Sequence, residues 1–216
     1  MDSRDVRREW AGRSGEYSPA YYAHYGVDGT SEAIVSAIES HLGPDPAILE
    51  IGCSSGRHLA ALCEAGYTDL TGVELNEGAR EVMTENFPAV ASTATVHYQS
   101  IESIVREFED DQFDAVFTVE TLQHLHPDSE WVFGELARIT ADLLLTVENE
   151  GPADVDRAES AGGEEGTGEP PVNYVDSEVP LYYRDWDAIF TPLGFEAVGV
   201  EGGKRDTIRT FRHRDR

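Results

Sequence analysis

The sequence predicts an α/β fold, a doubly wound, seven-stranded and mainly parallel sheet with a C-terminal antiparallel hairpin. Short apolar runs alternate with helical segments along most of the 216 residues, which is the pattern of a parallel sheet covered by helices on both faces. The last two runs, 195–200 and 206–211, are separated only by residues 201–205. Because so short a link cannot hold a crossover helix, these two runs are expected to pair antiparallel.

Five earlier apolar runs of strand length supply the parallel part of the predicted sheet. They are residues 47–53, 69–75, 94–99, 113–119 and 142–148. Helical signals lie between them: Leu59 and Leu62 share one helix face before Gly66, which suits the left-handed position beyond a helix end. Asn76 and Asp128 are expected to cap two further helices.

The chain is predicted to consist of an N-terminal arm and one domain. Residues 1–29 are polar and rich in aromatic side chains without a clear period, and we interpret them as a lid. Residues 30–216 are predicted to form a single domain. Within it, residues 151–171 contain many acids and hardly any large apolar side chain, so this segment is expected to be a mobile surface loop.

Acidic residues dominate the charge of the chain. Asp and Glu number 42 against 16 Lys and Arg, which gives a formal net charge of −26, and Lys204 is the single lysine. Molar salt screens such a surface, because the Debye length falls to about 3 Å. The composition is therefore typical of a salt-rich cytoplasm such as that of a haloarchaeon, and an acidic protein of an ordinary cytoplasm is the alternative. The acidity also argues against tight binding to nucleic acid.

Cysteine content and hydropathy exclude several other classes of protein. Cys53 and Cys63 are too few for a disulfide framework or a cysteine-rich metal site, which favours a reduced compartment. Residues 1–10 lack the apolar core of a signal peptide, and no stretch approaches the roughly 18 apolar residues of a membrane span. We therefore expect a soluble, cytoplasmic protein.

Candidate site residues lie at the ends of the first two predicted strands. In a doubly wound sheet, ligands bind beyond the carboxyl ends of the strands, where the strand order reverses. The first strand contains Glu50 and ends in a turn of small residues from Gly52 to Gly56, which lets a ligand approach the backbone. Glu74 ends the second strand, where an acid binds ribose hydroxyls and has little structural purpose. The turn lacks the G-x-G-x-x-G fingerprint of dinucleotide sites, which argues against NAD.

On these residues the chain resembles the class I S-adenosylmethionine-dependent methyltransferases, from about residue 48 to its end. The turn EIGCSSG is similar to the acid-x-Gly-x-Gly-x-Gly motif of that family, with Ser54 in place of the middle glycine. The resemblance implies S-adenosylmethionine as the cofactor and a methyltransferase domain over residues 30–216. The cofactor contacts that it implies are Glu50, Gly52, Cys53, Ser54, Gly56, Glu74, Leu75, Ser100, Ile101 and Thr118. For Glu50, direct ligand contact and satisfaction by neighbouring backbone N–H groups are both open.

Residues 113–127 resemble the fourth motif of small-molecule methyltransferases. They lack the Asn/Asp-Pro-Pro-Tyr run of nucleic-acid enzymes that methylate amino groups, so the resemblance implies a small-molecule acceptor and in-line methyl transfer. Thr118, Glu120 and Thr121 are then expected near the methyl sulfonium. The alternatives are a regulatory protein that binds S-adenosylmethionine without turnover and an aminopropyl transferase on the same fold.

His124 is the candidate general base, because a hydroxyl or amine acceptor must lose a proton. A purely structural histidine and transfer by positioning alone are the alternatives. No third ligand at convincing spacing accompanies His124 and His126, so no metal is expected. Aromatic faces attract a sulfonium, and the arm supplies candidates for a lid and acceptor wall, unless they only pack an N-terminal helix. These candidates are Tyr21, Tyr22 and Tyr25.

Overall fold

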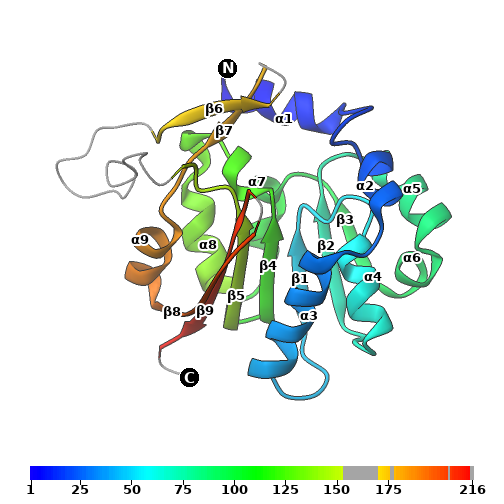
Figure 1. Cartoon of the computed structure of the whole chain (residues 1–216), viewed down its shortest axis with the longest axis vertical. Coiled ribbons are helices and arrows are strands. Elements are labelled where there is room, and N and C mark those ends of the chain that lie inside the picture. Colours follow the sequence, from blue (N-terminus) through cyan, green and yellow to red (C-terminus); the bar gives the residue numbers. More distant parts are fainter. Residues whose placement is uncertain (153–169, 176–177, 204, 215–216) are drawn as a thin grey trace.

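A seven-stranded sheet forms the centre of the molecule, with the order β3-β2-β1-β4-β5-β9-β8 (Figure 1). The computed structural model describes residues 1–152, 170–175, 178–203 and 205–214. The strands are β1 (Ile48–Ile51), β2 (Leu70–Glu74), β3 (Thr95–Tyr98), β4 (Phe113–Val119), β5 (Thr140–Glu148), β8 (Phe195–Gly202) and β9 (Thr207–His213). The first five run parallel, and β9 lies antiparallel between β5 and β8. The predicted doubly wound sheet and its closing hairpin are confirmed.

The strand order reverses at β1, which lies between β2 and β4. Ile51, the last residue of β1, is in register with Val73 on one side and Thr118 on the other. The backbone that follows β1 therefore emerges between the ends of two neighbouring strands. This is the position at which doubly wound sheets bind ligands.

Helices cover both faces of the sheet, and alternate residues of the strands point to each of them. Ile48 packs with the helices of one face, whereas Leu49 and Ile51 pack with those of the other. The first face is covered by α3 (Gly29–His41), α4 (Arg57–Glu64), α5 (Ala79–Asn86) and α6 (Pro88–Thr93). The second is covered by α7 (Ile101–Ile104), η1 (Val105–Glu107), α8 (Trp131–Ile139) and α9 (Trp186–Phe190). The remaining short 3-10 helices, labelled η like η1, are η2 (Leu122–His124), η3 (Pro127–Ser129) and η5 (Thr191–Leu193).

The N-terminal arm contains two helices that the sequence did not reveal. They are α1 (Ser3–Ala11), capped by the side chain of Asp2, and α2 (Pro19–Tyr25), capped by Ser18. In α1, Val6 is buried but the helix carries no continuous apolar stripe. Because α1 packs through only a few side chains, the spacing of its apolar residues does not show the helical period.

A second sheet consists of β6 (Val172–Val175) and β7 (Val179–Tyr182), which pair antiparallel. All four residues of β7 are buried, and β7 contacts both α1 and η2. In Figure 1, this hairpin and α1 lie on the same side of the main sheet. The proposed acidic loop at 151–171 lies for the most part outside the described residues.

Two predicted helix caps are wrong. Helix α5 begins after Gly78, and α8 begins after Glu130. Asn76 instead accepts the N–H of Gly78 at 3.0 Å in the turn before α5, and Asp128 belongs to η3. In both places a turn precedes the helix. The Asn76 side chain stabilises the first turn, whereas in the second the backbone N–H of Asp128 donates to Nδ1 of His126 at 3.2 Å.

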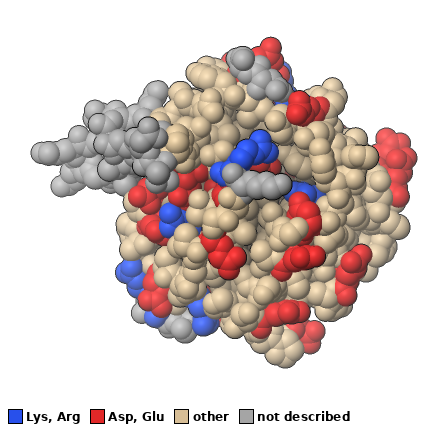
Figure 2. All heavy atoms as spheres, viewed as in Figure 1, with Lys and Arg blue, Asp and Glu red and all other residues tan. Residues whose placement is uncertain are grey.

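Acidic side chains are spread over the visible face of the molecule and do not gather in one patch (Figure 2). A dispersed acidic surface maximises hydration and keeps like charges apart. On this face the distribution is that of a solvated exterior.

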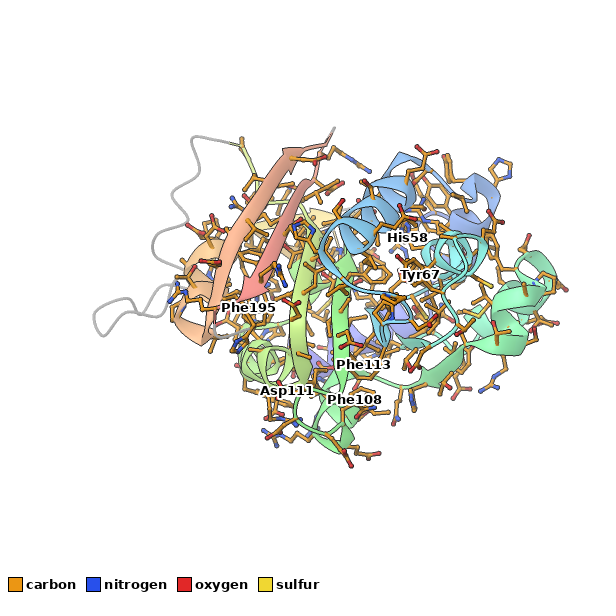
Figure 3. All side chains as sticks on the ribbon, turned by 90° about the horizontal axis from the view of Figure 1, so that it is seen from below. His58, Tyr67, Phe108, Asp111, Phe113 and Phe195 are labelled. Atoms are coloured by element: carbon orange, nitrogen blue, oxygen red, sulfur yellow. The ribbon has the colours of Figure 1, made fainter. Side chains whose placement is uncertain are left out.

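Aromatic side chains fill the core between α9 and the β8–β9 hairpin. Phe190, Phe195 and Phe211 are each 0% exposed. The ring centroid of Phe190 lies 5.6 Å from that of Phe211 and 6.4 Å from that of Phe195. Figure 3 shows Phe195 apart from Phe108 and Phe113, whose rings meet edge to face with centroids 5.1 Å apart.

Truncating Phe190 to alanine is expected to lower the free energy of unfolding by about 3–5 kcal/mol, because the ring is buried among other aromatic rings. Leu193→Ala is the control, since Leu193 is 38% exposed in the following turn, and a change within about 0.5 kcal/mol is expected there. Denaturant unfolding in concentrated salt measures both values. Equal losses for the two variants would contradict the assignment of this core.

Candidate active site

A cavity lies beyond the carboxyl ends of the parallel strands, between the sheet and the N-terminal arm. Its empty volume is about 1130 Å³, a value that includes solvent space at its open mouth. The sheet contributes residues 50–54, 73–76, 99–102, 119–121 and 124–126 to its wall. Helix α4 adds Arg57 and His58, and the arm adds Ser3, Val6, Arg7, Trp10, Arg13, Tyr17, Pro19 and Tyr22.

The turn after β1 has a left-handed backbone at three positions. Gly52 has φ +74°, Ser54 has φ +48° and Gly56 has φ +83°. A Cβ atom on Gly52 would stand 2.1 Å from Oγ1 of Thr121, so only glycine permits the close approach of the β1 and β4 ends. Ser54 adopts the conformation of the glycine that it replaces, at a cost of about 1 kcal/mol or more.

Glu74 holds this turn in place from the end of β2. One of its carboxyl oxygens accepts the N–H of Ser54 at 2.8 Å, and the other accepts the N–H of Asn76 at 2.6 Å. Burial raises the pKa of Glu74, and the backbone donors oppose that shift. The expectation that this carboxylate has little structural purpose is therefore wrong. Each oxygen still has room for a further donor from the cavity.

Glu50 lies in the cavity wall as an unpaired buried acid. The residue is 1% exposed, and neither carboxyl oxygen has a hydrogen-bond partner among the described residues. Burial raises its pKa well above the usual range, while the charge of Arg57 and the N–H of Leu59 favour ionisation without forming such a bond. The possibility that backbone N–H groups satisfy Glu50 is not realised.

The turn after β4 is held on its N–H side by a buried acid at the end of β5. Glu148, 0% exposed, accepts the N–H groups of Thr121, Leu122 and Gln123 at 3.0–3.2 Å. It also accepts the hydroxyl of Thr118 at 2.6 Å. Burial raises the pKa of Glu148 to about 7, although all these donors favour the carboxylate.

The same turn is held on its carbonyl side by Arg184, whose side chain is fully buried. The guanidinium donates to the carbonyls of Leu122 at 3.0 Å and Leu125 at 2.7 Å. It also lies over the rings of Phe133 and Tyr182, 5.4 Å and 5.0 Å from their centroids. The planar, multivalent head of arginine suits this task better than a lysine would.

The arm closes the cavity through polar and aromatic contacts. In α1, Arg7 pairs with Glu102 at 2.7 Å, and the ring of Trp10 lies 4.5 Å from that of His124. In α2, the hydroxyl of Tyr22 donates to Glu120 at 3.3 Å. These contacts place α1 and α2 over the cavity, and a lid function of residues 1–29 stays a prediction.

Residues 48–142 match a family described as "Methyltransferase domain". An O-methyltransferase of Pyrenophora dematioidea is 22% identical over 129 residues, which are 55% of this chain and 48% of that protein. O-methyltransferase cnsE of Penicillium expansum is 25% identical over 92 residues, 43% of this chain and 33% of that protein. The match thus spans half or less of the length of these curated relatives.

Solved structures share the architecture at low sequence identity. Magnesium protoporphyrin IX methyltransferase of Synechocystis PCC 6803, with bound SAH, has a TM-score of 0.65 at 16% identity, covering 98% of this chain and 100% of that one. A SAM-dependent methyltransferase from Methanosarcina mazei has a TM-score of 0.62 at 18% identity, covering 82% and 96%. The chain has the class I methyltransferase fold.

Most of the predicted cofactor contacts of this methyltransferase fold line the cavity, and two do not. Glu50, Gly52, Cys53, Ser54, Glu74, Leu75, Ser100 and Ile101 belong to its wall. Thr118 is 0% exposed and turned toward Glu148, so its predicted place beside the ligand is wrong. Gly56 begins α4 behind the turn, where an added Cβ would meet Met83 at 2.8 Å. Burial raises the pKa of Cys53, which leaves its thiol protonated and unreactive.

Of the three tyrosines predicted for the lid, Tyr22 alone lines the cavity. Tyr25 is 59% exposed, and its hydroxyl lies 3.5 Å from that of Tyr21 on the outer side of α2. The i, i+4 spacing brings these two hydroxyls together. The ring of Tyr22 packs edge to face on that of Tyr21, with centroids 5.4 Å apart, and its hydroxyl reaches Glu120. The prediction is therefore wrong for Tyr21 and Tyr25.

His124 lies in the cavity wall with both ring nitrogens engaged. Nδ1 donates to the carbonyl of Pro180 at 3.0 Å, and Nε2 faces the amide nitrogen of Gln123 at 3.3 Å. Burial lowers its pKa to about 4. A neutral imidazole tied on both sides fits the structural alternative better than the role of general base.

Other expectations concern metal and membrane. Among the residues that the structure describes, no group of His, Cys, Asp and Glu side chains could hold a metal ion. Within the same ranges, no helix is long and apolar enough to cross a membrane.

Glu148→Gln is expected to lower the free energy of unfolding by about 2–3 kcal/mol, because the new amide NH₂ group faces donors where the carboxylate accepted them. Binding of S-adenosylhomocysteine is expected to weaken as the turn at Thr121 relaxes. The control is Glu178→Gln on an exposed side chain. Chemical denaturation and calorimetry measure the two effects, and a variant indistinguishable from the wild type in both would refute the anchoring role.

The depressed pKa of His124 predicts a pH-dependent stability. The unfolded chain takes up the proton near pH 6.5 and the folded chain only near pH 4, so stability is lost as the pH falls through this window. Between pH 7 and 5 the wild type is expected to lose about 2 kcal/mol more than His124→Asn, whose amide keeps a donor for Pro180. Urea unfolding at both pH values measures the difference. Equal losses would indicate a histidine that titrates normally and restore the hypothesis of a general base.

Proposed function

We propose that this protein is an S-adenosylmethionine-dependent methyltransferase that transfers a methyl group to a small-molecule acceptor by in-line displacement. The methyltransferase domain match and the shared fold support the proposal. The two fungal relatives are O-methyltransferases, which also supports the proposal and favours oxygen as the methylated atom. A cavity covered by α1 and α2 suits a small acceptor better than a polymer.

The unpaired carboxyl of Glu50 is the observation that carries this proposal. A buried charge without a partner is costly, so its place in the wall is explained by a ligand that supplies a cation or donors. The amino group of the methionine part of S-adenosylmethionine is such a partner. The remaining lone pairs of Glu74 suit the two ribose hydroxyls, and the small residues of the turn between them leave room for the ligand backbone.

The residues present therefore fit the cofactor, which supplies an electrophilic methyl group on a sulfonium. The chain itself would bind and orient the reactants. The rings of Trp10 and Tyr22 in the arm exclude water and offer faces that a sulfonium prefers. Methyl transfer needs an aligned nucleophile about 3 Å from the carbon, so this positioning supplies much of the rate.

The composition supports a salt-rich cytoplasm as the place of action. The formal charge of −26 destabilises the compact state through repulsion between like charges, and concentrated salt screens that repulsion. The same charge disfavours nucleic acid as the acceptor. We also infer that residues 30–216 act as one methyltransferase domain beneath the lid.

Two ligands separate the roles of the two acids. Glu74→Gln is expected to weaken binding of both S-adenosylhomocysteine and 5′-deoxy-5′-methylthioadenosine by about 10–100-fold, because both contain the ribose. Glu50→Gln is expected to weaken only the first to that extent, since the second lacks the amino-acid tail.

Calorimetric titration in about 2–3 M KCl measures these affinities, at a salt concentration that screens the acidic surface. The matched control is Glu77→Gln, an exposed neighbour of Glu74, which is expected to bind both ligands as the wild type does. If folded wild-type protein binds neither ligand, the proposed function is wrong. Identical losses in the Glu50 and Glu74 variants would overturn their separate assignments.

A further inference from the structure

Glu120, directly after β4, lies in the cavity wall on a strained backbone. Its φ of +47° is in the left-handed region, which non-glycine residues adopt only when surrounding contacts hold them. Its own N–H donates to the carbonyl of Val147 at 2.8 Å, and the next N–H, of Thr121, is held by Glu148. The side chain is 22% exposed and faces the cavity.

Groups from two other elements face the carboxylate of Glu120. The hydroxyl of Tyr22 in α2 donates to one oxygen at 3.3 Å, and Arg205 in the β8–β9 turn lies 3.8 Å from the other. Asp206 and Tyr17 complete the charged and titratable surroundings. Burial and the nearby carboxylate raise the pKa of Tyr22 well above its usual range, so its hydroxyl stays protonated and donates.

The position of Glu120 relative to the cofactor follows from the turn after β1. Gly52 abuts Thr121, the neighbour of Glu120, so closely that no Cβ fits between them. A ligand that contacts Glu50 with its amino group and Glu74 with its ribose has its sulfonium between these parts. The transferable methyl group of such a ligand would then face the end of β4, where Glu120 and Thr121 lie.

We propose that Glu120 is the catalytic residue that takes the proton of a hydroxyl acceptor, with Tyr22 as a positioning residue; this inference rests on the proposed function. The acceptor oxygen forms the new bond to the methyl carbon as the carbon–sulfur bond breaks and its electron pair returns to sulfur. The hydroxyl proton passes to a carboxylate oxygen of Glu120 and later to water. His124, tied on both nitrogens, has no free lone pair for this step.

The charges of the wall select a neutral acceptor. Four acids line the cavity: Glu50, Glu74, Glu102 and Glu120. Three arginines also line it: Arg7 is paired with Glu102, Arg57 is paired with Asp28, and Arg13 donates to the carbonyl of Glu16 at 3.0 Å. An acceptor carrying a carboxylate or phosphate would meet like charges, whereas a neutral phenol or alcohol would not.

The first test needs no acceptor. Glu120→Gln keeps the side-chain volume and an oxygen that can accept from Tyr22, but it removes the negative charge. That charge favours S-adenosylmethionine, whose sulfur is cationic, over S-adenosylhomocysteine, whose sulfur is neutral. The ratio of their dissociation constants, Kd(SAH)/Kd(SAM), is expected to fall about tenfold in this variant and to stay within about twofold in Glu77→Gln. An unchanged ratio in the Glu120 variant overturns the proposal.

A second variant covers the case in which Glu120→Gln fails to fold. Arg205 is 65% exposed, so Arg205→Gln should preserve the fold. Loss of the facing cation leaves more net negative charge beside the sulfonium, so the Kd(SAH)/Kd(SAM) ratio is expected to rise about twofold or more in this variant. A ratio equal to that of the wild type contradicts the assignment.

Turnover tests the chemistry with catechol as the hydroxyl probe and methyl-labelled S-adenosylmethionine. Glu120→Gln is expected to lower kcat by about 10²–10³ with KM within about threefold. A kcat equal to that of the wild type overturns the proposal. If the wild type binds cofactor but leaves catechol unmethylated, the Kd(SAH)/Kd(SAM) ratios of the variants decide whether the assignment of Glu120 stands. If it binds neither SAM nor SAH, the proposed function fails first.

Discussion

One buried carboxylate determines the shape of the site. Glu148 accepts three successive N–H groups, those of residues 121–123, and Arg184 donates to two carbonyls of the same turn. Without these partners an irregular buried segment would leave its backbone groups unpaired, at about 1–3 kcal/mol each. The position of Glu120 relative to Gly52 is therefore imposed from β5 and from the chain after β7, while the sequence of the turn itself does not determine it.

This dependence explains which parts of the molecule the sequence could predict. The strands, the closing hairpin, Glu50 and Gly52 are local signals, since an apolar run and the turn that ends it are adjacent in the chain. Glu148 and Arg184 act on residues up to 30 and 62 positions away, and no spacing rule connects them. The lid helices and the β6–β7 hairpin were missed for a related reason, because their packing depends on partners outside their own segments.

Glu74 has a structural role that its place in the sequence does not reveal. A carboxylate at that strand end was assigned to a ligand because it had no evident structural task, yet it fixes the N–H groups of Ser54 and Asn76. A carboxylate offers about four lone-pair sites, so anchoring a turn and accepting ligand hydroxyls do not compete. The proposed ligand role would profit from the structural one, because an acid whose position is fixed in advance loses less entropy when a ligand binds.

The lid is joined to the site by contacts that end on the cavity wall itself. Arg7 reaches Glu102, Tyr22 reaches Glu120, and Trp10 packs on His124. Under the proposed function, opening of the arm would exchange a few such contacts for water at modest cost, whereas its closure would remove water and strengthen the charge interactions inside. In the proposed mechanism Tyr22 orients Glu120 only when α2 is in place, so closure of the arm and completion of the reaction centre would be a single event.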